Sequence, residues 1–461
     1  MVEFLISSLP ALMFFCMVLG LFTGYPVAFV LGAVGIFFGL IGIWVGEFHM
    51  IQFMNVMPRI YRQTVENPVF VAIPLFIFMG AVLQHSKVAD GLLLSLERVL
   101  SRTRGGLAIA VILVGTVLAA MTGMIGASVV VISLIALPLM MQRAYNPSLA
   151  SGAVAAAGTL GILIPPSIML VVMGDMLQTS VAALFAGAIL PGLLLAICYI
   201  LYIVILGWSK PEVAPVAPPR AVAEDGSRTS ALREFLGAML PPMALIFVVL
   251  GSIYGGWATP TEAAGVGCLG ALVLAAAKRQ LSFRQLKEML YGACSTVGMV
   301  YFVIFGATLF SYVFRVLGGD EMVIGMLEAM GLDTGMHILI ALMVGVFFLG
   351  FFFDWLEICL IALPIFGPIL ATAEFGLVDG AQPVLVWAAV LVAINMQTSF
   401  ITPPFGFALF YMRGVAPASI STVSIYKGVI PFVAIQIVVV VVAVLFPDLI
   451  LFLPRYWGLL F

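Results

Sequence analysis

Two pairs of adjacent prolines lie inside long apolar stretches, and each pair is flanked by small residues and by side chains that carry oxygen. Around the first pair the residues are Gly158, Thr159, Gly161, Pro165, Pro166 and Ser167; around the second they are Asn395, Thr398, Ser399, Thr402, Pro403, Pro404 and Gly406. Hydroxyls, amides and freed backbone carbonyls are ligands that suit a hard cation such as sodium.

The proline pairs predict two broken helices, because proline lacks the backbone donor and displaces the preceding residue from the helical region. We expect helical structure to stop near Ile164 and Thr402 and to resume at Pro166 and Pro404, since proline is tolerated in the first turn. In hydrocarbon, such a break occurs only where it is buried in protein or lines a wet cavity. The end of the first half-helix favours a cation, and the start of the second favours an anion.

A second group of candidate residues, Thr122, Gly123, Gly126 and Ser128, lies between the apolar runs 107–121 and 129–139. One interpretation is the tip of a re-entrant hairpin, whose carbonyls and hydroxyls bind a cation. The other is a set of small residues that lets two helices pack closely. The same two interpretations apply to the residues that precede each proline pair.

A third group, Gly350, Asp354 and Glu357, lies between the apolar runs 344–353 and 358–366. A carboxylate at membrane depth is costly and is a functional candidate by default. Asp354 and Glu357 are three residues apart and share a face if the segment is helical. They order a hairpin tip or an ion site, pair with a cation such as Arg315 or Arg413, or face water at an exposed tip.

The composition indicates the environment in which this chain folds. Apolar residues make up 64% of its 461 residues and charged residues only 9%, which is far from the composition of soluble domains. Apolar runs of up to about 20 residues, several of them shorter, predict an all-α polytopic membrane protein. We expect about 11 to 14 membrane elements, in which spanning helices are mixed with half-helices and re-entrant hairpins. The net charge of −2 says nothing about nucleic acid, and no basic tract suggests a nucleic-acid partner.

Sequence patterns of catalysis are missing. The five cysteines stand singly in apolar segments, and the three histidines are far apart in the sequence. Asp175 and Asp354 have no protease signature around them, and no nucleophile–base or zinc-ligand spacing occurs. We therefore predict that the chain is not an enzyme and that it has no cofactor. A channel is also disfavoured, because it does not need two sealed broken-helix sites.

An internal duplication is indicated by the word LIALP, which occurs at residues 134–138 and again at 360–364, an offset of 226. A Pro-Pro pair follows in each half, and the offset places Ser128 opposite Asp354. Each repeat is predicted to contain a hairpin, a span and a broken helix. Between the repeats, residues 208–234 are polar and rich in Pro and Ala, as in a flexible linker. Their basic residues predict a cytoplasmic location.

Longer words of the sequence resemble the large membrane subunit of tripartite ATP-independent periplasmic (TRAP) transporters. They are AIPLFIFMGA (72–81), AAGTLGILIPPSIM (156–169), ATPTEAAG (258–265), FDWLEICLIALPIFGPI (353–369) and ITPPFGFALFYMRGVAP (401–417). They occur in the family order and cover nearly the whole chain. The first tip, TGMIGAS (122–128), departs from the Gly-Ser-rich tip of many members, and the linker after Trp208 is longer than the family leads us to expect.

The resemblance implies a multi-pass protein of a bacterial inner membrane that imports an organic acid by sodium symport. It implies two partners in separate chains, a small membrane subunit and a periplasmic substrate-binding protein. It also implies a scaffold and an elevator-type transport domain that carries both hairpins and both broken helices. The alternative is a standalone sodium- or proton-coupled carboxylate transporter of the wider ion-transporter superfamily.

With that plan we divide the chain into six parts. Residues 1–84 are scaffold helices, and residues 85–207 are a first repeat and a following span, with the tip near 122–128 and the break at 164–166. Residues 208–234 are the linker, and residues 235–316 are scaffold helices with the start of the second repeat. Residues 317–415 are the second repeat, with its tip near 350–357 and its break at 402–404, and residues 416–461 are a C-terminal span.

Overall fold

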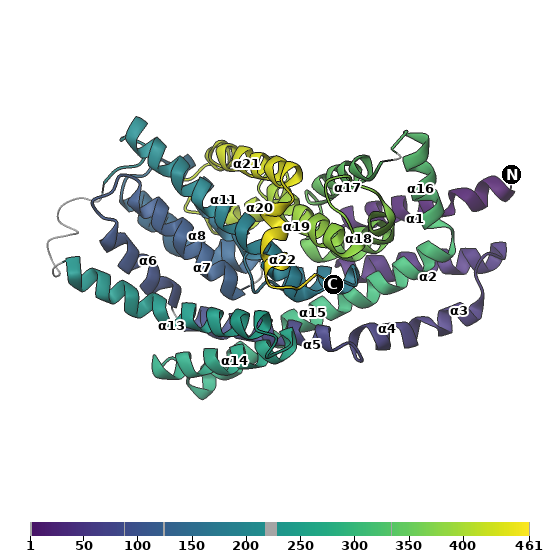
Figure 1. The fold of residues 1–461 in the computed structure, drawn as a ribbon, viewed down its shortest axis with the longest axis horizontal. Coiled ribbons are helices and arrows are strands. Elements are labelled where there is room, and N and C mark those ends of the chain that lie inside the picture. Colours follow the sequence, from purple (N-terminus) through teal and green to yellow (C-terminus); the bar gives the residue numbers. More distant parts are fainter. Residues whose placement is uncertain (1, 87, 123–124, 217–227, 333, 461) are drawn as a thin grey trace.

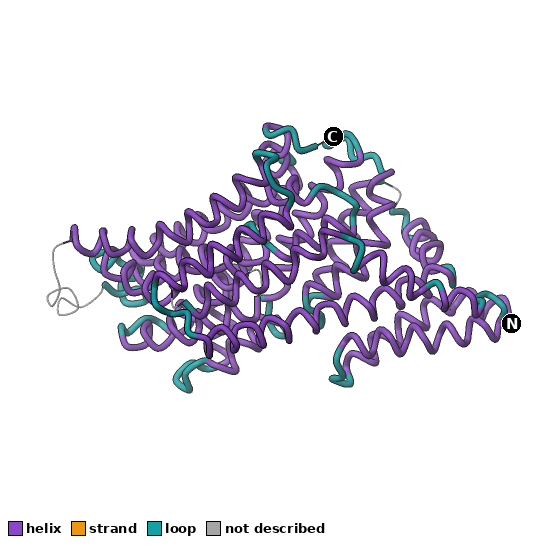
Figure 2. Tube along the Cα trace, turned by 90° about the horizontal axis from the view of Figure 1, so that it is seen from below, coloured by secondary structure: helices purple, strands orange, loops and turns teal. Residues whose placement is uncertain are grey.

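The computed structural model describes residues 2–86, 88–122, 125–216, 228–332 and 334–460, and in these ranges it consists of helices and their connections (Figures 1 and 2). The first half contains α1 (Val2–Phe22), α2 (Val27–Val45), α3 (Met50–Met54), α4 (Val56–Thr64), α5 (Pro68–His85), α6 (Val88–Val99), α7 (Gly106–Thr122), α8 (Ile125–Gln142), α9 (Pro147–Thr159), the 3-10 turn η1 (Leu160–Ile162), α10 (Ile168–Met176) and α11 (Val181–Ser209). The second half contains α13 (Arg228–Tyr254), α14 (Pro260–Ala277), α15 (Phe283–Val316), α16 (Gly319–Ala329), α17 (Gly335–Leu349), α18 (Trp355–Thr372), α19 (Ala381–Phe400), α20 (Phe407–Val415), α21 (Thr422–Leu445) and α22 (Asp448–Tyr456).

Ten of the described helices are long and apolar enough to cross a membrane, and four shorter apolar helices accompany them. The predicted all-α polytopic architecture is therefore confirmed. Both hairpins are present: α7 and α8 pack side by side around the first tip, and α17 and α18 around the second.

The duplication extends over most of the chain. Shifts of 226 to 233 residues between their first residues relate α1 to α13, α2 to α14, α6 to α16, α7 to α17 and α8 to α18. The packing follows the same relation, because α2 packs on α15 as α14 packs on α5, and α1 packs on α16 as α13 packs on α6. Likewise α8 packs on α20, and α18 packs on α10. The short helix of each half thus lies against the hairpin of the other half.

The helices form two groups, which we name by position. The flanking group comprises α1–α6 and α13–α16, and the core group comprises α7–α11 and α17–α22. In Figure 1, α13, α14, α5 and α4 of the flanking group run along the lower edge, while α11, α20, α21 and α17 of the core group lie above them. Both breaks and both hairpin tips belong to the core group.

The two halves differ in how the flanking group is connected. In the first half, α4 ends at Thr64 and α5 begins at Pro68, where the Asn67 side chain accepts a hydrogen bond from the Val69 amide at 3.0 Å. A proline in the first turn and an asparagine cap favour a new helix at this point. In the second half, the 34-residue helix α15 passes without interruption through the corresponding positions.

The predicted breaks are present, but the predicted restart positions are wrong. Regular α-helix ends at Thr159 and Phe400, close to the expected stops, whereas α10 begins at Ile168 and α20 at Phe407 rather than at Pro166 and Pro404. The reason is backbone geometry just after each pair: Ser167 is extended, with φ −119° and ψ 127°, and Gly406 has φ −42° and ψ 118°. Helical angles begin only at the next residue.

The linker between the two halves is shorter than the predicted range 208–234, and hydrogen bonds hold its first residues in place. α11 continues to Ser209 and α13 begins at Arg228. The Gly105 amide donates to the Ala214 carbonyl, and the Asn146 amide donates to the Val213 carbonyl, each at 3.1 Å. These two bonds attach the first linker residues to the open end of the first hairpin. Residues 217–227 lie outside the described part of the chain.

Helices α9 and α21 pack closely enough that glycine is required at their crossing. A Cβ atom on Gly428 would overlap the carbonyl oxygen of Ser148, and one on Gly152 would overlap that of Gly428. Small residues at such crossings let two backbones approach in hydrocarbon. This contact holds the first broken helix against the helix that follows the second one.

Gly428→Ala is therefore expected to lower the apparent Tm of the detergent-solubilised protein by several degrees, because the added methyl group must push the two backbones apart. The matched control is Gly298→Ala on α15, where a Cβ atom would meet no atom within 4 Å. Equal Tm values for the two variants would contradict this account of the crossing. Fluorescence-detected thermal unfolding measures both.

Candidate functional site

The two broken helices meet inside the core group. The Gln397 amide nitrogen of α19 donates to the Thr159 hydroxyl oxygen, at the end of α9, over 3.5 Å. Both side chains are completely buried. The other end of the amide, Gln397 Oε1, is buried and has no hydrogen-bond partner among the described residues. A polar oxygen left unpaired in a membrane protein's interior is costly unless a ligand or water satisfies it.

Hydroxyl groups near both breaks donate to backbone carbonyls of their own segment. Thr398 donates to Ile394 at 2.9 Å, Thr402 to Thr398 at 2.7 Å, and Ser167 to Ile162 at 2.6 Å. A hydroxyl that donates its hydrogen in this way still has lone pairs on its oxygen with which to accept or to bind a cation. The geometry thus leaves oxygen lone pairs for a cation at each break.

The remaining predicted residues of the breaks have structural tasks. The Asn395 amide nitrogen donates to the Met343 carbonyl of α17 at 2.6 Å, which fastens α19 to the second hairpin. Gly161 is buried in the 3-10 turn, and Pro165 and Pro166 lie between that turn and α10. Pro403 and Pro404 occupy the equivalent place before α20, and Gly406 is the residue that precedes its first turn. The Pro404 carbonyl accepts a hydrogen bond from the Tyr426 hydroxyl of α21 at 2.9 Å, so it is already paired.

The second hairpin tip is closed by a carboxylate cap. Asp354 accepts a hydrogen bond from the Trp355 amide at 2.8 Å and so caps α18. Glu357, one turn later, is only 7% exposed, and its Oε2 atom has no partner within the described residues. Gly350 lies so close to the Ser399 hydroxyl that a Cβ atom there would overlap it. The second tip therefore sits against the end of α19.

Of the roles considered for these carboxylates, pairing with Arg315 is not found. Arg315 contacts Asp320 instead, with 3.6 Å between Nε and Oδ2. The burial of Glu357 also excludes a solvated tip for that residue. Ordering of the tip is found at Asp354, and the role at an ion site stays a prediction.

The first hairpin tip is less fully described. α7 ends at Thr122 and α8 begins at Ile125, while Gly123 lies outside the described residues. A Cβ atom on Gly126 would lie 2.9 Å from the Tyr411 ring of α20, so the tip contacts the short helix of the other half. Ser128 is buried in the first turns of α8. Asp175 lies near the end of α10 and accepts a hydrogen bond from Asn67.

Sequence reasoning missed Gln397, Tyr411 and Tyr426. Gln397 stands within the polar run NMQTS at 395–399, which was a usable signal. The two tyrosines stand in apolar segments, and only their contacts in the fold give them importance.

Two prolines of α18 free carbonyls that the flanking group then binds. Pro364 and Pro368 lack an N–H, so the carbonyls of Leu360 and Pro364, four residues earlier, lose their helical donors. The Ser311 hydroxyl donates to the Leu360 carbonyl at 3.4 Å, and the Arg315 guanidinium donates to that of Pro364. Both donors lie on α15 and are also four residues apart. The spacing of the donors thus matches the spacing of the freed acceptors.

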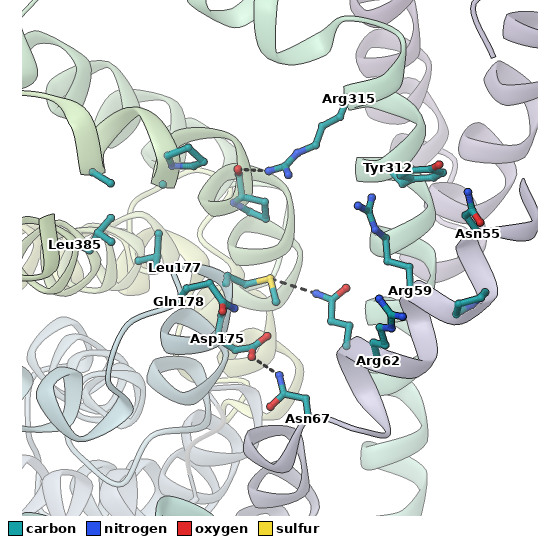
Figure 3. Close-up of a pocket in the computed structure, with 17 residues that line it drawn as sticks. Asn55, Arg59, Arg62, Asn67, Asp175, Leu177, Gln178, Tyr312, Arg315 and Leu385 are labelled. Carbon is teal, nitrogen blue, oxygen red and sulfur yellow. Dashed lines mark hydrogen bonds between the residues drawn. The ribbon is translucent and has the colours of Figure 1, made fainter. Parts of the chain in front are cut away.

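A cavity of about 920 Å³ lies beside this contact, between α4, α10, α15 and α18 (Figure 3). Figure 3 shows Arg59 and Arg62 extending from α4, and Arg315 reaching from α15 toward α18. The opposite wall includes Asp175, Leu177 and Gln178 from the end of α10 and the loop after it. The cavity therefore separates the flanking group from the core group.

Comparison with known proteins decides the family. The model of the family described as "Tripartite ATP-independent periplasmic transporter, DctM component" matches residues 14–449. The chain belongs to this DctM family. Membership confirms the resemblance inferred from the sequence, and with it a transporter large permease subunit of the bacterial inner membrane.

Curated relatives of this DctM-family chain are named for different solutes. The C4-dicarboxylate TRAP transporter large permease protein DctM of Pseudomonas aeruginosa is 32% identical over 401 residues, covering 86% of this chain and 88% of that protein. The ectoine TRAP transporter large permease protein TeaC of Halomonas elongata is 27% identical over 418 residues, covering 89% and 92%. The isethionate TRAP transporter permease protein DctMQ of Oleidesulfovibrio alaskensis is 31% identical over 410 residues, but the match covers only 60% of that longer protein.

The fold also occurs in a solved transporter structure. The Alcanivorax borkumensis YdaH transporter superposes with a TM-score of 0.61 at 12% identity, covering 87% of this chain and 89% of that chain. At this identity the likeness concerns the fold alone.

The match between freed carbonyls and donors is testable with a double-mutant cycle. Arg315→Met should destabilise the protein by about 1–3 kcal/mol, because it leaves the Pro364 carbonyl unpaired. Pro368→Ala restores an N–H that can bind this carbonyl within α18, so Arg315→Met should cost much less in that background. Denaturant unfolding of the wild type, the two single variants and the double variant measures the coupling free energy. Additive effects would show that Arg315 stabilises the protein in another way.

Proposed function

We propose that the chain is the large transmembrane subunit of a sodium-coupled secondary transporter that imports an organic acid. The observation that carries this proposal is the meeting of the two broken helices at Thr159 and Gln397, with an unpaired amide oxygen between them. Matched broken helices at a repeat interface are the hallmark of substrate and ion sites in secondary transporters.

Sodium coupling is supported by the kind of ligand at this meeting point. The hydroxyls of Thr159, Thr398 and Thr402 donate to backbone carbonyls and keep their lone pairs for a cation. Neutral oxygens of this kind suit a hard monovalent ion. One ionised carboxylate at the neighbouring tip, from Asp354 or Glu357, offsets the charge of the ion. The start of α10 and the start of α20 remain for the anionic part of the solute.

The solute class and the partners follow from the family by analogy. Two of the relatives are named for C4-dicarboxylate and isethionate, which are organic anions. The family name denotes a three-part transporter of the periplasm. We therefore propose a periplasmic substrate-binding protein that delivers the solute, a small membrane subunit in a separate chain, and no catalytic activity, cofactor or nucleic-acid partner.

An elevator movement is supported by an asymmetry in an otherwise repeated packing. In the first half, α5 packs against α7 and α10, whereas its counterpart α15 packs against α18. The two halves of the flanking group thus hold the core group in different ways. We propose that a second state exists in which the core group has moved along the flanking group and these contacts are exchanged.

The proposal predicts solute uptake into proteoliposomes that contain the chain and its small subunit. Uptake should require both a sodium gradient and the solute-loaded binding protein, because the described residues form no large domain outside the membrane elements to capture solute. Proton-driven uptake in sodium-free buffer would disprove the coupling. Robust sodium-dependent uptake of free solute without the binding protein would favour a standalone carrier.

Thr402→Val removes one hydroxyl while keeping the side-chain shape. It should raise the sodium concentration for half-maximal uptake by about tenfold, the effect of losing about 1.4 kcal/mol of ion binding. Thr296→Val on α15 is the matched control, since its hydroxyl also donates to the carbonyl four residues earlier, at 3.1 Å, but lies outside the core group. If both variants keep the wild-type sodium dependence, the Thr402 hydroxyl is not a ligand.

A further inference from the structure

Three arginines face the cavity between the flanking and core groups. Arg59 and Arg62 are one helical turn apart on the short helix α4, and Arg315 lies near the end of α15 (Figure 3). Residues three apart on a helix share a face. Their elements therefore place three positive charges around one space of about 920 Å³.

The carboxylates nearby offset only part of this charge. Asp175 is the acidic residue among those that line the cavity, and it accepts a hydrogen bond from Asn67. Arg315 contacts Asp320 at 3.6 Å. Within the described part of the chain, no carboxylate forms an ion pair with Arg59 or Arg62. The cavity therefore has a surplus of positive charge.

The arginines are held in ways that leave donors available. The Arg59 guanidinium lies 4.5 Å from the centre of the Tyr312 ring, and stacking on a ring leaves the N–H groups at the guanidinium edge free. One guanidinium nitrogen of Arg315 donates a hydrogen bond to the Pro364 carbonyl. Such a set of donors fits the paired oxygens of a carboxylate or a phosphate.

The position of the cavity suits an entry point. Gln178 on its wall lies just before α11, which begins at Val181 and ends at Ser209, where the linker begins. With the linker in the cytoplasm, as its basic residues predict, the cavity lies toward the periplasmic side. From there, the nine residues of α10 span about 13 Å to the first proline pair, at 1.5 Å per residue.

We propose that Arg59, Arg62 and Arg315 form an anion-binding site in which a carboxylate is held before it reaches the broken helices. That this carboxylate belongs to the transported solute rests on the proposed import of an organic acid. A phosphate of an anionic lipid headgroup has the same chemistry, and α4 also exposes Met57 and Tyr61, which suit a membrane surface. The experiment must therefore distinguish solute from lipid.

The test compares the purified membrane complex with its Arg59→Gln/Arg62→Gln variant in nanodiscs of phosphatidylcholine alone. Succinate is titrated at constant ionic strength, and the shift in thermal unfolding is followed. We expect saturable stabilisation of the wild-type complex and at least about a tenfold higher apparent Kd in the variant. Arg284→Gln/Lys287→Gln is the matched control, because it removes two exposed charges three residues apart on α15, far from the cavity.

A second arm replaces part of the phosphatidylcholine with phosphatidylglycerol. If the lipid headgroup is the anion, this lipid stabilises the wild-type complex, the stabilisation disappears in the arginine variant, and succinate has no effect in either. If neither anion has an effect that depends on Arg59 and Arg62, the site does not exist.

The outcome is independent of the uptake measurement. An anion effect that depends on the arginines, in a complex that fails to import any organic acid, would leave the site standing and refute the proposed function. Sodium-driven uptake of an organic acid with no arginine-dependent anion effect would support the proposed function and refute the anion site.

Discussion

The whole arrangement depends on one requirement of a hydrocarbon solvent, which is that every backbone carbonyl freed by a proline must find a donor inside the protein. The structure meets it with side chains from neighbouring helices. Ser311 and Arg315 serve the Leu360 and Pro364 carbonyls that Pro364 and Pro368 free in α18. Each such bond also joins two helices that are distant in the sequence. The prolines that interrupt helices therefore create the contacts between them, including the contact between the flanking and core groups.

The duplication explains why the two breaks meet. Because α8 packs on α20 while α18 packs on α10, each half completes the surroundings of the other half's break. The candidate site therefore lies where the two halves cross. The hydrogen bond between Gln397 and Thr159 joins the two halves at this crossing, and both of its side chains are wholly buried.

Local sequence rules predicted the elements well and their mutual contacts poorly. The proline pairs located both breaks because the effect of proline acts within one helical turn. They misplaced the restarts because extended angles at Ser167 and Gly406 delay each new helix. The contacts of Gln397 with Thr159 and of Tyr411 with Gly126 join residues from different halves, and no local pattern encodes such pairing. Arg59 and Arg62 escaped notice because a short amphipathic helix was not among the apolar spans that identify membrane elements.

The interruption between α4 and α5 has a consequence for the proposed movement of the core group. A carrier built from two identical halves would have two end positions of equal energy, related by exchange of the halves. Here one half has a joint at Asn67 and Pro68, and the other has the rigid rod α15. Bending at the joint between α4 and α5 and bending of α15 cost different amounts of free energy. The two end positions therefore no longer have equal energy. If the core group moves as proposed, this difference between the halves contributes to a preference of the empty carrier for one side of the membrane.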